Sequence, residues 1–311
     1  ESYCEQGRNF WNKSWNAFLL VQGWSGTEVS PSASARVAIN WFENRLSEQI
    51  QEINDLFSKY RISEALMATY KLIWDDFCSW YLEAVKPEFI EGIPQPLSEH
   101  TISKTKDFLE VLLKLVHPFM PFVSEEIWHL IKSRDEKESV MLSDSPKQTS
   151  FNAEIIKEVE KAKEIISNVR MIRQQKAISP KERLKLNYRI IKVGLSDELN
   201  PFISKLANLS AIEAVTEKVS FAAGFVTLDA EFFVPLGIKL DIGAERERIE
   251  KEIDSLNGFL KSVNAKLSND KFVSFAKAEV VENERKKFGR IFTMEEKINL
   301  SLINKIGRAH V

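Results

Sequence analysis

The chain has 311 residues, of which 44% are hydrophobic and 28% are charged, and these values are ordinary for a globular protein of two or three domains. Its two cysteines, Cys4 and Cys78, exclude a disulfide framework and a CxxC metal pair, so we expect a zinc-free, cytoplasmic protein. No apolar run is long enough to span a membrane, and we therefore expect no membrane partner.

Charge is distributed unevenly along the chain, although the formal net charge is only -2. Residues 1–150 contain 15 basic and 22 acidic side chains, a balance of -7. Residues 157–192 contain 11 basic and 4 acidic side chains, a balance of +7. The near-neutral mean therefore hides a basic segment that follows an acidic one.

Residues 1–150 predict a bundle of about five helices, because apolar side chains recur at helical spacing and all seven tryptophans lie there. The predicted helices cover residues 3–21, 33–59, 63–86, 101–116 and 121–131. We expect a loop over residues 91–96 and a polar, charged linker over residues 132–149. The linker places a domain boundary at residue 150.

Residues 151–240 predict a small α/β module that begins with a helix over residues 152–176. Beyond Pro180 the apolar residues alternate with period two, which is typical of strands. The remaining predicted elements are a short helix over residues 197–208 and strands over residues 184–190, 212–216, 225–228 and 231–236.

Residues 241–305 predict an antiparallel coiled-coil hairpin, so the predicted fold class is mainly α: a bundle, a small α/β module and a coiled-coil arm. Apolar residues spaced alternately by four and three positions form a heptad seam. They are Ile249, Ile253, Leu256, Leu260, Val263 and Leu267. Residues 306–311 continue no earlier pattern, and we interpret them as a non-native tail. The chain opens at Glu1 inside an amphipathic pattern, and we interpret it as a fragment.

The sequence offers no residues that predict catalysis. It has no GxGxxG, P-loop or HExxH motif, and its four histidines are scattered. No Ser/His/Asp set and no cluster with metal-ligand spacing is recognisable. We therefore predict no catalytic residue and no metal site in this chain.

Three segments resemble those of one enzyme family. Residues 4–17, CEQGRNFWNKSWNA, resemble the helix that follows the catalytic core of class I valine–tRNA ligases. Residues 117–128, HPFMPFVSEEIW, resemble the signature of the anticodon-binding bundle in the valine, isoleucine and leucine enzymes. Residues 266–273 and 279–285, KLSNDKFV and EVVENER, are similar to the C-terminal coiled coil that singles out the valine enzymes. The resemblance covers about residues 1–300.

The resemblance implies the tRNA-binding C-terminal part of a ligase that attaches valine to its tRNA with ATP. The family's ATP-holding HIGH and KMSKS sequences and its editing domain are absent from the chain, so we expect the segment alone to be inactive and free of cofactors. ATP and Mg²⁺ are expected in a preceding catalytic domain. The expected partners are the valine tRNA and the catalytic and editing domains, and the expected oligomeric state is a monomer.

The polar face of the first helix is the candidate anticodon site. Its donors Asn9, Asn12, Lys13 and Asn16 follow the i, i+3, i+4, i+7 spacing of one helical face, and Arg8 lies beside them. Amide side chains both donate to and accept from the edges of splayed bases. By resemblance, Lys13 contacts the anticodon and Leu20 packs against a base. The alternative is a solvated polar face that only begins the bundle.

Two basic groups are further candidates, because phosphate contacts dominate tRNA affinity. Arg170, Arg173 and Lys176 have helical spacing within the basic segment, which makes them candidates for backbone contact, and the alternative is a solvated helix face. By resemblance, the coil contacts the outer corner of the tRNA. The candidates there are Lys266, Lys271, Arg285 and Lys286.

Several conspicuous residues are predicted to be structural. Pro118 and Pro121 fix the entry of a helix, and Phe119 and Phe122 fill the core. The same core role is predicted for Trp74, Trp80 and Trp128.

Two rival functions remain open at this point. An isoleucine or leucine ligase would share the bundle, but those enzymes often end in a zinc module, which two cysteines do not build. A helical or coiled-coil scaffold that binds protein is the second rival, and it would have no affinity for RNA.

Overall fold

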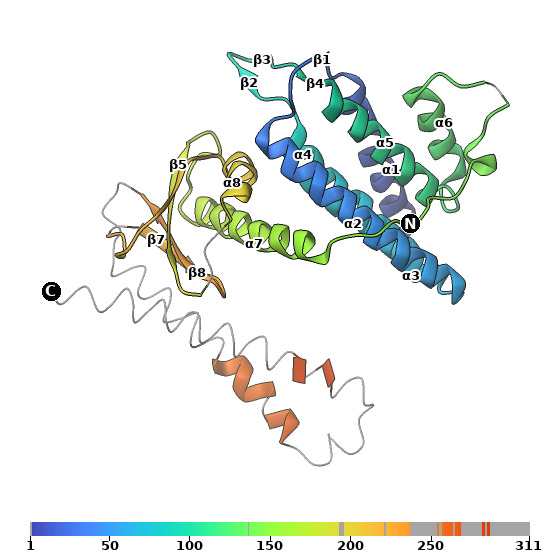
Figure 1. Cartoon of the computed structure of the whole chain (residues 1–311). Coiled ribbons are helices and arrows are strands. Elements are labelled where there is room, and N and C mark those ends of the chain that lie inside the picture. Colours follow the sequence, from blue (N-terminus) through green and yellow to red (C-terminus); the bar gives the residue numbers. More distant parts are fainter. Residues whose placement is uncertain are drawn as a thin grey trace. The chain divides into compact units, whose positions relative to one another are not determined.

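The computed structural model divides into two compact units. Unit 1 comprises Glu1–Glu182 and Ser196–Leu209, and unit 2 comprises Arg183–Leu195 and Ser210–Val311. Helices predominate, which confirms the mainly α fold class (Figure 1). The structure describes residues 2–135, 137–192, 196–220, 222–236, 254, 257–263, 265–268, 282–283 and 285–286.

Unit 1 begins with α1 (Ser2–Gln22) and α2 (Ala33–Ser58), both predicted from apolar periodicity. Ser32 is the N-cap of α2, and its hydroxyl accepts a hydrogen bond at 3.2 Å from a backbone N–H three residues further on. α2 contacts most of the other helices of the unit, and its Trp41 and Phe42 side chains are fully buried. It is therefore the central helix of the bundle.

The helix predicted over residues 63–86 is continuous but not uniform. α3 (Ile62–Lys71) continues into a π-helix, η1 (Leu72–Tyr81), and the helix ends as α4 (Leu82–Val85). The N–H of Leu82 donates to the carbonyl of Phe77, five residues earlier, which is π-helical pairing. Apolar periodicity does not distinguish this wider winding from an α-helix. Because π-helical segments are rare and often lie at functional sites, the side chains that η1 presents to α1 are of particular interest.

The loop predicted over residues 91–96 contains a tight hairpin. β2 (Phe89–Ile90) pairs antiparallel with β3 (Ile93–Pro94), and both residues of the turn between them have positive φ. Positive φ at two consecutive turn positions matches the twist of a two-residue hairpin. A second short pair, β1 (Gly26–Thr27) with β4 (Leu97–Ser98), is parallel and joins the segments before α2 and α5.

α5 (Glu99–Val116) and α6 (Pro121–Ile131) complete the bundle. The prediction that Phe122 fills the core is wrong, because its side chain is 89% exposed. Phe122 lies in the first turn of α6, away from the buried face of that helix. Phe119 is half-buried and stacks on the half-buried Phe57, with ring centroids 6.0 Å apart, so it lies at the edge of the predicted core. The buried face of α6 carries Ser124, Ile127, Trp128 and Ile131.

Residues 132–149, predicted as a linker, are fastened to the bundle at several points. A short 3₁₀ turn, η2 (Val140–Leu142), lies within the stretch, and its first side chain is buried. A carboxylate of α6 accepts from the backbone N–H of this turn, which a polar linker pattern does not predict. The fastening contacts join Glu125 to Val140 at 3.0 Å, Glu110 to Arg134 at 2.9 Å, and Ser47 to Thr149 at 2.6 Å.

α7 (Ala153–Gln175) and α8 (Asn200–Ala207) belong to unit 1, since both contact α2. A 3₁₀ turn, η3 (Asp197–Leu199), leads into α8. The sequence pattern groups residues 151–240 into one module, whereas the structure assigns these helices to the same unit as the bundle. The apolar stripe of α7 shows that one face is buried but does not say which partner covers it.

A buried group of charges ties α7 to the bundle. The carboxylate of Asp76, in η1, accepts hydrogen bonds from Arg45 Nε at 2.9 Å and from Lys163 Nζ at 3.1 Å. Asp76 and Lys163 are each only 7% exposed, and the ammonium lies 4.2 Å from the centroid of the Trp41 ring. Glu48 and Glu160 supply the further negative charges, at 2.5 Å from Arg45 and 2.8 Å from Lys163. Because a buried charge is strongly destabilising without a partner, the ion pairs of Asp76 hold α2, η1 and α7 together.

Unit 2 contains a four-stranded sheet in the order β6-β5-β8-β7. β8 pairs antiparallel with β5 and with β7, and the side chains of β8 are buried over most of its length. All four predicted strands are present, with ends displaced by at most three residues. Their bounds are β5 (Leu184–Ile190), β6 (Leu209–Ala214), β7 (Ala222–Val226) and β8 (Ala230–Pro235).

Most of the predicted arm over residues 241–305, and all of the tail over residues 306–311, lie outside the described residues. Residues 257–263 of the arm are helical, and the predicted seam residue Val263 is buried. Among the helices that the structure describes, none is both long and apolar enough to cross a membrane.

Candidate nucleic-acid interface

α1 divides its residues between a buried face and an exposed face. The buried face contacts η1, α5 and α6 and carries Phe10, Ala17, Phe18 and Val21. Asn9, Asn12 and Asn16 are exposed, as the predicted helical face requires, and so is Arg8. Leu20, one turn beyond Asn16, is 42% exposed. Five of the six residues predicted for the anticodon site are therefore open to a ligand.

Lys13, the sixth residue, is half-buried and makes contacts within the protein. Its Nζ donates a hydrogen bond to Ser79 Oγ at 3.2 Å and lies 4.0 Å from the centroid of the Trp74 ring. Both partners belong to η1, the π-helical segment. Neither contact is predictable from the sequence pattern, because Ser79 is 66 residues away from Lys13 in the chain.

The Trp74 ring lies in a stack of aromatic side chains. It stacks on Tyr70 with ring centroids 5.6 Å apart and an interplanar angle of 11°, and Tyr70 in turn lies 4.9 Å from Phe10 of α1. Trp74 and Trp80 are only half-buried, whereas Trp128 is buried as predicted. The Trp74 ring thus contacts both the Lys13 ammonium and the Tyr70 ring.

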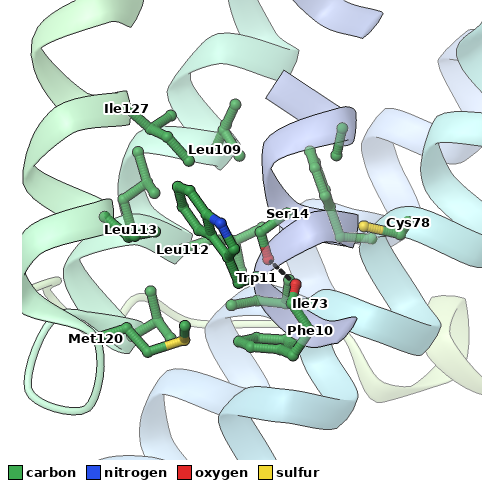
Figure 2. A pocket seen from close by; sticks show the side chains of 14 residues that line it. Phe10, Trp11, Ser14, Ile73, Cys78, Leu109, Leu112, Leu113, Met120 and Ile127 are labelled. Carbon is green, nitrogen blue, oxygen red and sulfur yellow. Dashed lines mark hydrogen bonds between the residues drawn. The ribbon is translucent and has the colours of Figure 1, made fainter. Parts of the chain in front are cut away.

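A small apolar cavity of about 20 Å³ lies where α1, η1, α5 and α6 meet. Figure 2 shows the Trp11 indole beside the side chains of Leu112 and Leu113, with Met120 below it, and Ser14 donating to the carbonyl of Phe10 at 3.0 Å. A cavity of this size has room for about one water, which needs two or more polar partners. The nearly apolar lining indicates imperfect packing and not a ligand site.

The thiol of Cys78 lines this cavity. Burial raises the pKa of Cys78 to about 12, while the Lys13 ammonium acts in the opposite direction. A thiol with this pKa is protonated at neutral pH and is a poor nucleophile. The described residues contain no group of three or more His, Cys, Asp or Glu side chains that would hold a metal ion.

The basic row of α7 is largely committed to contacts within unit 1. Arg170 donates to the carbonyl of Leu206 through Nη2 at 2.9 Å, and its guanidinium lies 5.3 Å from the Trp80 ring centroid. Arg173 is only 7% exposed. Its Nη1 and Nη2 atoms donate, at 2.8–3.1 Å, to the carbonyls of Ser179, Glu182, Ala207 and Asn208.

The structure describes all of the remaining basic candidates except one. Lys176 is the half-buried C-cap of α7. In the arm, Lys266, Arg285 and Lys286 are exposed, and Lys286 lies 3.7 Å from a glutamate one turn earlier. Lys271 lies outside the described residues.

Comparison with known protein families matches two parts of the chain. Residues 40–188 match the anticodon-binding domain of tRNA ligases, and residues 241–304 match the valyl tRNA synthetase tRNA-binding arm. These matches place the chain in the class of tRNA ligases, represented here by a region that includes the anticodon-binding domain.

Similar full-length proteins narrow this class. The chain is 47% identical to the valine–tRNA ligase of Phocaeicola vulgatus and 45% identical to that of Bacteroides thetaiotaomicron, in each case over 92% of this chain and 32% of the relative. It is 34% identical to the Enterococcus faecalis valine–tRNA ligase over 90% of this chain and 33% of the relative. The chain thus spans about a third of the length of the curated relatives it matches. It belongs to the valine–tRNA ligase family and corresponds to the C-terminal part of that enzyme.

Proposed function

We propose that this chain is the part of a valine–tRNA ligase that binds and positions the valine tRNA. The observation that carries the proposal is the match of residues 241–304 to an arm named for the valine enzyme, which favours valine over isoleucine or leucine. ATP, Mg²⁺ and the reacting groups belong, in this proposal, to a catalytic domain outside the chain. The protein would act in the cytoplasm as a monomer, with tRNA as its partner.

The exposed face of α1 is the proposed anticodon contact. Asn9, Asn12 and Asn16 offer amide donors and acceptors to the edges of splayed bases, and Leu20 offers an apolar surface for one of them. Binding energy gained there, far from the reacting ester, would hold the acceptor end in place for catalysis elsewhere. This chain would position the tRNA and would supply no catalytic group.

Phosphate contacts are proposed for six basic residues. Arg8, Lys266, Arg285 and Lys286 are exposed and Lys176 is half-buried, whereas Lys271 lies outside the described residues and is included from the sequence alone. Together they would neutralise part of the tRNA backbone charge, which makes binding dependent on salt. The sequence also predicts this role for Arg170 and Arg173. Arg170 is itself exposed, but both guanidinium groups donate to backbone carbonyls, which supports a structural role. In this proposal, Arg170 and Arg173 stabilise unit 1, to which α1 belongs, and do not contact phosphate.

The direct test is equilibrium binding of the whole chain to valine, isoleucine and leucine tRNAs at two salt concentrations. The proposal expects selective retention of valine tRNA and weaker binding at higher salt. Equal binding of all three tRNAs would remove the assignment to valine. Equal indifference to all three would remove tRNA binding altogether and favour a scaffold that binds protein.

A matched pair of variants tests the α1 surface. Asn16→Ala is expected to weaken valine tRNA binding about tenfold, because one or two hydrogen bonds to a base edge are lost. Asn54→Ala removes an asparagine of α2 that is also exposed, and it is expected to leave affinity unchanged. Equal affinities for the two variants would place the anticodon contact elsewhere.

A further inference from the structure

The Lys13 ammonium is held by two side chains of the π-helical segment η1, and nothing in the family matches accounts for this arrangement. The Ser79 hydroxyl donates to the carbonyl of Trp74 at 2.8 Å and receives the hydrogen bond from Lys13 Nζ at 3.2 Å. A hydroxyl has a single proton, so donation to the carbonyl leaves its oxygen as the acceptor for the ammonium. The two hydrogen bonds therefore run from Lys13 to Ser79 and from Ser79 to the carbonyl of Trp74.

The π-helical winding is what lets both partners reach one lysine. Ser79 and Trp74 are five residues apart, and in an α-helix such residues lie about 140° apart around the axis. Pairing between residues i and i+5 brings them onto neighbouring turns of the same side. One widened segment thus supplies an acceptor for the ammonium and an aromatic face beneath it.

Aromatic contacts connect Trp74 back to α1. Trp74 stacks on Tyr70, and Tyr70 contacts Phe10, three residues before Lys13. Lys13 of α1 therefore contacts η1 directly, and η1 contacts α1 again through Tyr70 of α3. These contacts within the protein favour a role for Trp74 in holding the lysine.

We propose that Ser79 and Trp74 are positioning residues that hold Lys13 beside the exposed asparagines of α1, ready to meet tRNA. The inference rests on the proposed function of the α1 face. An ammonium has three donors, and the contact with Ser79 uses one of them. A long side chain that is already ordered loses less freedom on binding, which corresponds to a gain in affinity of about three- to tenfold.

A double-mutant cycle with the whole chain and valine tRNA tests this proposal. Ser79→Ala is expected to weaken binding about three- to fivefold and to leave the salt dependence unchanged, because no charge is lost. Lys13→Ala is expected to weaken binding more and to reduce the slope of log K against log salt by about 0.7. In the Lys13→Ala background, Ser79→Ala is expected to have no further effect.

Three controls separate positioning from general damage to the helix. Ser79→Thr keeps the hydroxyl and is expected to bind like the unmodified chain. Trp74→Phe keeps a smaller aromatic face and is expected to lose at most about threefold. Ser58→Ala removes an exposed serine that also donates to a backbone carbonyl, and it is expected to leave binding unchanged.

The outcomes distinguish the inference from the function on which it rests. Failure of the unmodified chain to bind any tRNA overturns both. If the chain binds valine tRNA and Ser79→Ala has no effect, or an effect that persists undiminished without Lys13, the positioning proposal alone is overturned. Loss of binding in Ser79→Thr with unchanged unfolding in urea also overturns it.

Discussion

The polar row of α1 and the basic row of α7 have the same kind of sequence pattern but different structural roles. In α1 the amide side chains at helical spacing are exposed, and the side chains of Phe10, Ala17 and Phe18 are buried. In α7, Arg173 is buried and donates to four backbone carbonyls that no apolar side chain would satisfy. Spacing identifies residues that share a face, but the partner of that face decides whether they meet solvent or the protein.

Both rows occur in one unit, so the difference does not arise from separate folding environments. It arises from the chain that packs over each helix. The carbonyls at the end of α8 and in the turn after α7 converge on Arg173, whereas α1 turns its asparagines away from η1, α5 and α6. A buried arginine is stable only with such a complete set of acceptors.

The largest expected effect concerns the charges buried under α7. Asp76→Ala leaves Lys163 and Arg45 without their shared carboxylate, and the free energy of unfolding is expected to fall by about 3–5 kcal/mol. Unfolding in urea, followed by circular dichroism, measures this. Asp55→Ala, which removes an exposed ion pair with Lys59, is expected to change stability by less than about 1 kcal/mol. Similar losses for the two variants would show that the Asp76 cluster is not effectively buried.

Arg173→Ala is expected to destabilise the protein by about 2–4 kcal/mol, because several carbonyls lose a charged donor. The same urea experiment measures the loss, with Lys181→Ala, an exposed basic residue nearby, as the control. Under conditions where the variant remains folded, its affinity for tRNA is expected to be unchanged. A variant of normal stability that binds tRNA poorly would restore Arg173 as a phosphate contact and break the contrast between the two rows.

Leu20 and Leu19 allow a sharper test of the α1 side. They are 42% and 48% exposed, but they point in directions that differ by about 100° around the helix. Leu20→Ala is expected to weaken valine tRNA binding about three- to fivefold with no change in salt dependence, because the lost contact is apolar. Leu19→Ala is the matched control. A larger loss from Leu19→Ala would mean that the bound face of α1 is rotated from the asparagine row.

The smallest expected effect is a gain in stability at the end of α7. Ala177 follows the C-cap with φ of 52°, a conformation that favours glycine. Ala177→Gly is expected to raise the free energy of unfolding by about 0.5–1 kcal/mol, whereas Ala153→Gly in the first turn should not raise it. Thermal unfolding of the two variants provides the measurement. Destabilisation by Ala177→Gly would indicate that its methyl group packs better than the backbone geometry implies.

Much of the secondary structure is predictable from the sequence, because apolar periodicity is a local property. The helices of the bundle and the four strands of the sheet appear close to their predicted positions. The π-helical winding of η1 and the exposure of Phe122 are not predictable in this way. The first depends on hydrogen bonds between residues five apart, and the second depends on which side of the first turn of α6 meets the bundle.

The candidate site is only partly predictable for a related reason. Helical spacing and resemblance select the exposed asparagines of α1, but they do not reveal that Lys13 has partners in η1. Likewise, the charge balance of residues 157–192 suggests phosphate contact without showing that Lys163 and Arg173 are buried. Contacts between distant segments decide these roles, and a single sequence does not reveal such contacts.

The fastening of residues 132–149 has a consequence for proteolysis. Arg134, with a side chain only 7% exposed, is sheltered from trypsin, whereas Lys147 lies in an exposed stretch between two fastening points. Trypsin is therefore expected to cut after Lys147 well before it cuts after Arg134. The two fragments would stay associated through the Asp76 ion pairs and the packing of α7 on α2, so the nick would become visible only on a denaturing gel.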